Sequence, residues 1–125
     1  MITKKLLVVL FSAWIIPQGI SWQTYIDMFP NIRELAKVES GSKNHPMGNP
    51  KAYNPKDTDG RPKYYLLQFG WWEFHHWAKL ADLESPDIKN PFHQIIVARW
   101  AEDNDMLNRW GPFKRLVREG KIMLE

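Results

Sequence analysis

The sequence NIRELAKVESG, residues 31–41, predicts the helix around which the rest of the chain is organised. Asn31 is a residue type that caps helix N-termini, and Glu34 three positions later completes the pattern of a capping box. Gly41 is placed to end the helix. The apolar residues recur at helical spacing and therefore share one face: Ile32, Leu35 and Ala36. Glu39 lies on the same stripe, seven residues after Ile32, so a carboxylate is expected on the apolar face at the end of the helix.

Apolar periodicity predicts further helices on both sides of this segment. A short amphipathic stretch covers residues 22–29, before Pro30. Another helix is expected over residues 71–82. Asn90-Pro91 has the pattern of an N-cap followed by proline at the first helical position, and the helix that it begins should end near Trp110. A last short helix should stop at Gly120.

Residues 40–63 differ in kind from the helical segments around them. They are rich in residues that break helices: Gly41, Gly48, Gly60, Pro46, Pro50, Pro55 and Pro62. Asp59-Gly60 is a turn sequence that could close a small hairpin. Loops longer than about 15 residues in a compact domain are usually functional or disordered. We therefore expect a mainly α fold with a long irregular loop, or a small β-hairpin, beside the functional groove.

Length and composition indicate one ordinary globular domain. The chain has 125 residues, of which 44% are hydrophobic and 25% charged, and this balance excludes an intrinsically disordered protein. Seven tryptophans are unusual in so short a chain. Most of them are expected in the core, although indole rings also stack on sugars. Of the pair Trp71-Trp72, one ring should face the core.

The N-terminal residues have the pattern of a secretory signal. Two lysines precede an apolar run over residues 6–16, and the small residues Gly19 and Ser21 follow. The run is shorter than the roughly 20 residues that span a bilayer. We therefore predict a signal peptide at residues 1–21 and a mature domain at residues 22–125. Retention of the run as an anchor is the alternative.

Cysteine usage and charge point to an exported protein of a bacterial envelope. The chain has no cysteine, so neither a disulfide framework nor a lipid-attachment cysteine is available. It carries 17 basic and 14 acidic residues. Removal of Lys4 and Lys5 with the signal would leave 15 basic residues and a net charge of +1. That balance gives no reason to expect a nucleic-acid partner.

Glu39 is the first candidate for chemistry. A carboxyl group on the apolar side of a helix end is partly desolvated, and desolvation raises its pKa. Such a group can donate a proton to a leaving oxygen near neutral pH, as cleavage of a glycosidic bond requires. The alternative is a glutamate that turns outward at a frayed helix end, and the spacing by itself favours that alternative.

Three pieces of sequence favour a catalytic role for Glu39 over the outward-facing alternative: Val38-Glu39-Ser40-Gly41, then Ala52-Tyr53-Asn54-Pro55, then Tyr64-Tyr65-Leu66-Leu67-Gln68-Phe69. In this order they resemble the core of the SLT-type lytic transglycosylases of the lysozyme-like superfamily. In that family a helix ends in Glu-Ser-Gly, a loop with Ala-x-Asn-Pro follows, and Ser-x-Gly-Leu-(Met/Leu)-Gln-(Ile/Phe) closes the site. The resemblance covers roughly residues 31–110 and weakens after Asn90-Pro91. The three pieces together are more specific than Glu-Ser-Gly alone.

The resemblance implies a lysozyme-like fold and a peptidoglycan substrate. Family members cut the bond between N-acetylmuramic acid and N-acetylglucosamine by attack of the muramic C6 hydroxyl, which leaves a 1,6-anhydro end. They use no metal and no organic cofactor. The implied partner of this chain is a peptidoglycan glycan strand, met in the periplasm or outside the cell by a monomer.

The same resemblance assigns roles to residues. Glu39 takes the place of the general acid and base, and Gln68 that of the glutamine near the bound sugar. Phe69 would pack behind the motif. The further residues expected to bind substrate are Ser40, Asn54, Tyr64, Tyr65 and Trp110.

Two departures from the family pattern bear on activity. Lys63-Tyr64-Tyr65 stands where the family has Ser-x-Gly, so both small residues are replaced. A tyrosine there could narrow the groove, move the substrate or mark a degenerate site. The family's Ala-Tyr-Asn-Ala-Gly segment, whose tyrosine often contacts the catalytic glutamate, is missing. Tyr64 or Tyr65 could substitute for that tyrosine.

A second carboxylate would separate a hydrolase from a lyase. Hydrolases pair two carboxyl groups across the bond. Asp57 and Asp59 could reach the groove, but their expected role is to form the turn. A transglycosylase with one glutamate is therefore favoured over a lysozyme-type muramidase, and a glycan-binding protein without turnover is the rival outside the enzymes. The four histidines lack the spacing of a metal site.

Overall fold

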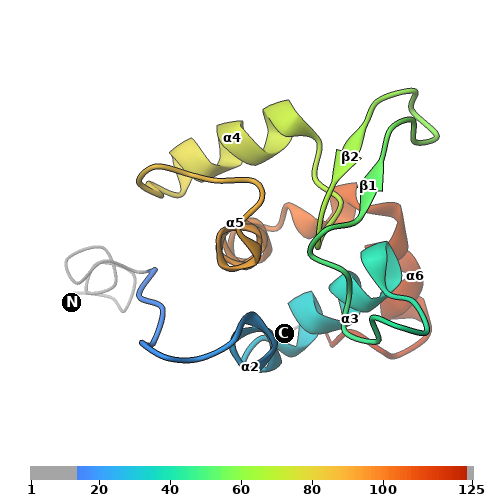
Figure 1. Ribbon diagram of the computed structural model, residues 1–125. Coiled ribbons are helices and arrows are strands. Elements are labelled where there is room, and N and C mark those ends of the chain that lie inside the picture. Colours follow the sequence, from blue (N-terminus) through green and yellow to red (C-terminus); the bar gives the residue numbers. More distant parts are fainter. Residues whose placement is uncertain (1–13, 124–125) are drawn as a thin grey trace, which may run out of the picture.

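The computed structural model describes residues 14–123, and Figure 1 shows a mainly helical chain with one small antiparallel sheet. The described elements, in chain order, are α2 Trp22–Asp27, α3 Pro30–Ser40, β1 Tyr53–Asn54, β2 Lys63–Tyr64, α4 Trp71–Leu80, α5 Pro91–Asp103, the 3₁₀ helix η1 Leu107–Arg109 and α6 Gly111–Arg118. The mainly α class expected from the sequence is confirmed. None of the described helices is long and apolar enough to cross a membrane.

Helix α5 forms the centre of the fold. In Figure 1 it is seen end-on, with α4 above it, α2 below it, and α3, α6 and the hairpin on the right. It contacts α2, α3, α4 and η1. Because neighbours surround it, a continuous run of its residues is buried: Gln94, Ile95, Ile96, Val97 and Ala98. Asn90 caps this helix as predicted, since its side chain accepts a hydrogen bond from the backbone nitrogen of Phe92 at 2.9 Å.

Helix α3 begins two residues earlier than the sequence predicts. Pro30 occupies its first turn, Phe29 is the N-cap, and no side chain makes a capping hydrogen bond. The predicted capping box of Asn31 and Glu34 is therefore wrong. A proline at the first helical position needs no partner for its nitrogen, so the helix starts there without a polar cap.

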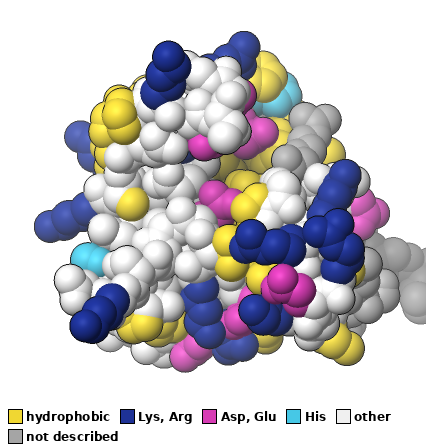
Figure 2. Space-filling model, turned by 90° about the vertical axis from the view of Figure 1, so that its right-hand side faces the viewer, with side chains coloured by type: hydrophobic (Ala, Val, Ile, Leu, Met, Phe, Trp, Pro, Cys, Tyr) yellow, Lys and Arg dark blue, Asp and Glu magenta, His cyan; other side chains and the backbone are white. Residues whose placement is uncertain are grey.

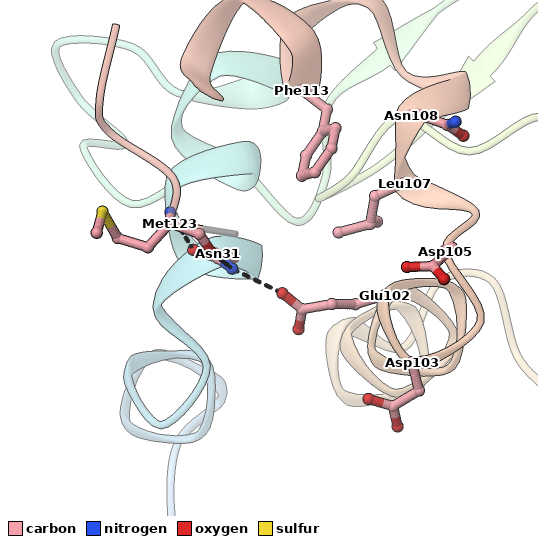
Figure 3. Close-up of a pocket in the computed structure, with 8 residues that line it drawn as sticks. All are labelled: Asn31, Glu102, Asp103, Asp105, Leu107, Asn108, Phe113 and Met123. Carbon is pink, nitrogen blue, oxygen red and sulfur yellow. Dashed lines mark hydrogen bonds between the residues drawn. The ribbon is translucent and has the colours of Figure 1, made fainter. Parts of the chain in front are cut away.

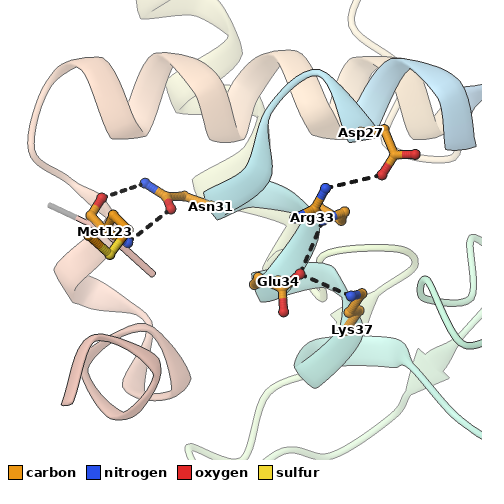
Figure 4. Close-up of polar contacts among 6 residues, drawn as sticks. All are labelled: Asp27, Asn31, Arg33, Glu34, Lys37 and Met123. Atoms are coloured by element: carbon orange, nitrogen blue, oxygen red, sulfur yellow. Dashed lines mark hydrogen bonds and ion pairs between the residues drawn. The ribbon is translucent and has the colours of Figure 1, made fainter. Parts of the chain in front are cut away.

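The two polar side chains of the predicted box make other contacts (Figure 4). Asn31 exchanges two hydrogen bonds with the backbone of Met123, and its Nδ2 also donates to Glu102 Oε2 at 2.8 Å. Glu34 pairs with Arg33 at 3.1 Å and with Lys37 at 3.0 Å. These contacts join the start of α3 to the end of α5 and to the C-terminal segment.

The end of α3 is fastened to the loops that surround the site. Gly41 ends the helix with extended backbone angles, and a Cβ there would collide with the backbone oxygen of Lys37. Ser40 Oγ donates to the oxygen of Leu66 at 2.6 Å and accepts from the nitrogen of Asn49 at 2.8 Å. The last turn of α3, which carries Glu39, is thereby held against the long loop at Asn49 and against the segment after β2 at Leu66.

The long loop contains the expected hairpin. Strands β1 and β2 pair antiparallel, with Tyr53 opposite Tyr64 and Asn54 opposite Lys63. The turn between them is closed by a hydrogen bond from Gly60 N to Asp57 O at 2.8 Å, and Gly60 takes a φ of 81°, which glycine adopts without strain. The sequence therefore located this turn correctly.

The pair Trp71-Trp72 does not divide between core and solvent. Trp71 is 57% exposed and Trp72 is 71% exposed, so the expectation that one ring faces the core is wrong. They form the first turn of α4, and the helix buries a later set of residues: Phe74, Trp77 and Ala78. The exposed rings contact histidines one turn further along the helix, with Trp71 near His75 and Trp72 stacked on His76.

The predicted signal peptide, residues 1–21, lies for the most part outside the described residues. Its last residues contact the domain, because the indole nitrogen of Trp14 donates to the oxygen of Ala81 at 2.6 Å. Ser21 caps α2 by accepting a hydrogen bond from Thr24 N at 3.1 Å. Cleavage after Ser21 would remove that cap, and it stays a prediction.

Candidate active site

A pocket of about 500 Å³ lies between the end of α3, the hairpin and the start of α6. Glu39 comes from α3, and the hairpin contributes Asp57, Thr58, Asp59 and Lys63. The remaining lining residues are Gln68, Glu73, Trp110, Gly111 and Pro112. Figure 2 looks onto this side of the molecule and shows acidic side chains near the middle of the face, with lysines and arginines spread toward its edges.

Glu39 is half-buried in the last turn of α3. Within residues 14–123, no side chain or backbone group donates a hydrogen bond to its carboxyl group, and no basic side chain pairs with it. Burial raises its pKa to about 7, and the negative charge of Asp57 acts in the same direction. Lys63 and Arg115 oppose the shift. At neutral pH Glu39 is therefore present in both protonation states, which suits a group that must give and take a proton.

Two other residues expected at the site line the same pocket. Gln68 has a φ of 54°, and its Nε2 donates to the oxygens of Ala52 at 3.1 Å and Tyr65 at 2.9 Å. These bonds fix the side chain at the edge of the hairpin. Trp110 forms a largely buried wall, and its ring packs edge-on against Phe69 at 5.1 Å. Glu39, Gln68 and Trp110 thus meet, and Phe69 packs behind them.

The other predicted substrate-binding residues do not line this pocket. Ser40 has the structural role described above. Asn54 reaches the pocket only through Asp57, to which its Nδ2 donates at 3.4 Å. Tyr64 follows Lys63 on β2, and because side chains alternate along a strand it projects to the opposite face. There its ring lies 5.3 Å from that of Tyr53.

The backbone conformation of Tyr65 bears on one departure from the motif that the sequence resembles. It stands where the family has glycine, and its φ is 65°, in the left-handed region that glycine favours. Its backbone nitrogen donates to the oxygen of Ala52 at 2.6 Å. The local chain path therefore has the form that a glycine motif would give, although a tyrosine occupies it.

Sequence reasoning undervalued two hairpin residues. For Asp57 the sequence allows a position in the groove but favours a turn-forming role, and Lys63 is considered only as a replacement for serine. Both line the pocket, and Lys63 Nζ lies 3.7 Å from Asp57 Oδ2 and 2.7 Å from Asp59 Oδ2. The hydrogen bond from Lys63, followed by one from the backbone of Arg61, lowers the pKa of Asp59. Strand alternation could have indicated that Asn54 and Lys63 face the same way.

A larger pocket of about 750 Å³ lies on another part of the molecule (Figure 3). It is lined by the end of α5, η1 and the C-terminal segment, and three of its residues are acidic: Glu102, Asp103 and Asp105. Glu102 accepts the hydrogen bond from Asn31 that joins α3 to α5. We interpret this hydrogen bond as structural. The pocket at Glu39 is the candidate active site, because the Glu39 carboxyl group is not used in a hydrogen bond between helices.

Two further observations complete the description of the site. Among the described residues, no three His, Asp or Glu side chains come together in a way that could hold a metal ion. The chain matches no protein-family model, no curated protein and no solved structure. The geometry of the pocket and the motif resemblance are thus the grounds on which a function can be argued.

Proposed function

We propose that this chain is an exported peptidoglycan lytic transglycosylase with a lysozyme-like fold. The observation that carries the proposal is Glu39: a carboxyl group without an ion-pair or hydrogen-bond partner in residues 14–123, half-buried in a pocket, with a pKa of about 7. Half-burial supports this interpretation over that of a glutamate turned outward into water. Gln68 and Trp110, the other two motif-related residues of the pocket, support the same assignment.

The proposed reaction begins with transfer of the Glu39 proton to the oxygen between N-acetylmuramic acid and N-acetylglucosamine. The bond from the anomeric carbon to that oxygen breaks, and its electron pair leaves with the oxygen. The C6 hydroxyl of the muramic residue then attacks the anomeric carbon and gives its proton to the Glu39 carboxylate. A 1,6-anhydro end forms and Glu39 regains its proton. Trp110 supplies an apolar wall suited to a sugar face.

A muramidase is the second candidate, because Asp57 lines the same pocket as Glu39. In that reaction water replaces the C6 hydroxyl, and a second carboxylate assists it or the developing positive charge. The product then carries a reducing end. A glycan-binding protein without turnover is the third candidate, favoured by Lys63 and Tyr65 in place of the small residues of the family motif.

The test is digestion of purified sacculi by the wild-type protein and by Glu39→Gln. We expect wild-type protein to release soluble muropeptides and Glu39→Gln to release none, with unchanged far-ultraviolet circular dichroism. Glu84→Gln, an exposed substitution beyond the far end of α4, is the matched control and should behave as wild type. Equal release by wild type and Glu39→Gln would exclude Glu39 as the acid.

Mass spectrometry of the products separates the candidates. Anhydro ends support the transglycosylase, and reducing ends, heavier by one water, support the muramidase. Binding of sacculi with no soluble product from the wild-type protein would select the glycan-binding alternative.

A further inference from the structure

The hairpin brings two side chains from opposite strands onto one carboxylate. Asn54 on β1 and Lys63 on β2 are directly opposite each other, so their side chains project from the same face of the hairpin. Asn54 Nδ2 donates to Asp57 Oδ1 at 3.4 Å, and Lys63 Nζ lies 3.7 Å from Asp57 Oδ2. Each oxygen of Asp57 thus has its own partner.

The backbone of the turn fixes the same residue. Asp57 N donates to Arg61 O at 2.9 Å, and Asp57 O accepts from Gly60 N at 2.8 Å. With both its backbone and its carboxyl group engaged, Asp57 is held at the pocket that Glu39 lines. The backbone bonds that close the turn do not require the two further contacts that the Asp57 carboxyl group makes with the side chains of Asn54 and Lys63.

We propose that Asn54 and Lys63 hold the Asp57 carboxylate at the pocket as a fixed negative charge that keeps the proton on Glu39. Asp57 is a positioning residue in this scheme, because it acts through Glu39 and not on the substrate. The inference rests on the proposed function, since it concerns the same proton donor. It gives the hairpin a role in the site that neither the turn nor the motif resemblance requires.

The charged residues that line the pocket or act on Glu39 come from four parts of the chain. The turn contributes Asp57 and Asp59, β2 contributes Lys63, α4 contributes Glu73, and α6 contributes Arg115. After burial, Asp57 is the group that raises the pKa of Glu39, whereas Lys63 and Arg115 lower it. Because Lys63 also pairs with Asp59 at 2.7 Å, its positive charge is shared between two carboxylates. The balance leaves the proton on Glu39 up to neutral pH.

The experiment is a ¹³C NMR titration of the Glu39 carboxyl carbon, assigned as the resonance that Glu39→Gln lacks. Asp57→Asn keeps the shape of the side chain and removes its charge. We expect the pKa of Glu39 to fall from about 7 toward, but not to, the ordinary value of 4.5, because burial remains. Glu84→Gln removes one distant negative charge and should leave the titration unchanged.

Asn54→Ala is the second variant, and it keeps the inference testable if Asp57→Asn does not fold. It removes the hydrogen bond from Asn54 to the Asp57 carboxylate, so the charge of Asp57 is less well fixed beside the pocket. The pKa of Glu39 should therefore also fall, but by a smaller amount than in Asp57→Asn. In digestions of sacculi, the alkaline limb of the pH profile should move to lower pH in both variants. A Glu39 resonance that titrates in Asp57→Asn as it does in wild type would overturn the inference.

The titration also separates this inference from the proposed function. If no variant and no wild-type protein releases muropeptides, the proposed function fails, while the NMR result still decides whether Asp57 holds the proton on Glu39.

Discussion

The raised pKa of Glu39 has a consequence for stability that can be measured without a substrate. The pKa is about 7 in the folded protein, compared with an ordinary value of 4.5. Between these two values the folded state binds the proton more tightly than the unfolded chain does. The stabilising contribution is complete below about pH 4.5 and is lost as the pH rises through about 7. Glutamine has no proton to lose, so Glu39→Gln should escape this loss.

The size of the effect follows from the difference between the two values. They differ by about 2.5 pH units, and one unit corresponds to about 1.4 kcal/mol, so the full effect is about 3 kcal/mol. Relative to wild type, Glu39→Gln should therefore gain about 3 kcal/mol in its free energy of unfolding between pH 4 and pH 8. Titrating groups that do not interact with Glu39 contribute equally to both proteins and cancel in the comparison.

Urea denaturation followed by tryptophan fluorescence at pH 4, 6 and 8 measures this difference. Glu84→Gln serves as the control, and its difference from wild type should stay constant across the same range. A difference between Glu39→Gln and wild type that does not change with pH would refute the reasoning, because it would mean that Glu39 is as well solvated in the folded protein as in the unfolded chain.

Two other substitutions test how the pocket is held in place. Gly41→Ala should destabilise the protein by about 2 kcal/mol or more, because the new Cβ would meet the oxygen of Lys37. Gly70→Ala is the control: Gly70 has nearly the same backbone angles but open space around it, so this substitution should cost less than about 1 kcal/mol. Urea denaturation of both variants measures the difference. Gln94→Leu should cost about 3 kcal/mol or more in the same assay, because the fully buried Gln94 side chain binds one backbone nitrogen and two backbone oxygens, and the nitrogen of Leu67 and the oxygen of Ile88 would be left without a partner. A stability equal to wild type would show that these bonds contribute nothing.

Local sequence rules located most of the fold. The apolar stripe of α3, the Asn90 cap of α5 and the turn at Gly60 all depend on interactions within a few residues, and all three are present. The glycine at position 41 was correctly expected to end α3. Glycine is not needed at this position to adopt a positive φ, because the φ of Gly41 is negative. It is needed because any side chain would meet the backbone oxygen of Lys37.

The errors came from residues whose role depends on distant partners. Asn31 was expected to cap its own helix, but its side chain contacts Glu102 and Met123, which are far away in the sequence. One ring of the pair Trp71-Trp72 was expected to face the core, but both are exposed because the first turn of α4 extends past the buried side chains. No periodicity within a segment carries this information.

The features of the candidate site also fall into those that local sequence predicts and those that depend on distant partners. The sequence by itself determined that Glu39 would share a face with Ile32 and Leu35 at the end of α3, because helical spacing fixes which residues share a face; it did not decide whether the carboxyl group would turn outward into water. The motif resemblance led us to expect Gln68 and Trp110 at the same site, whereas only the tertiary structure decided that the carboxyl group would be half-buried and that Asp57 and Lys63 would line the pocket beside it. The physical reason is that desolvation and charge depend on what lies within a few ångströms in space, and that is settled by the packing of α6 and the hairpin against α3.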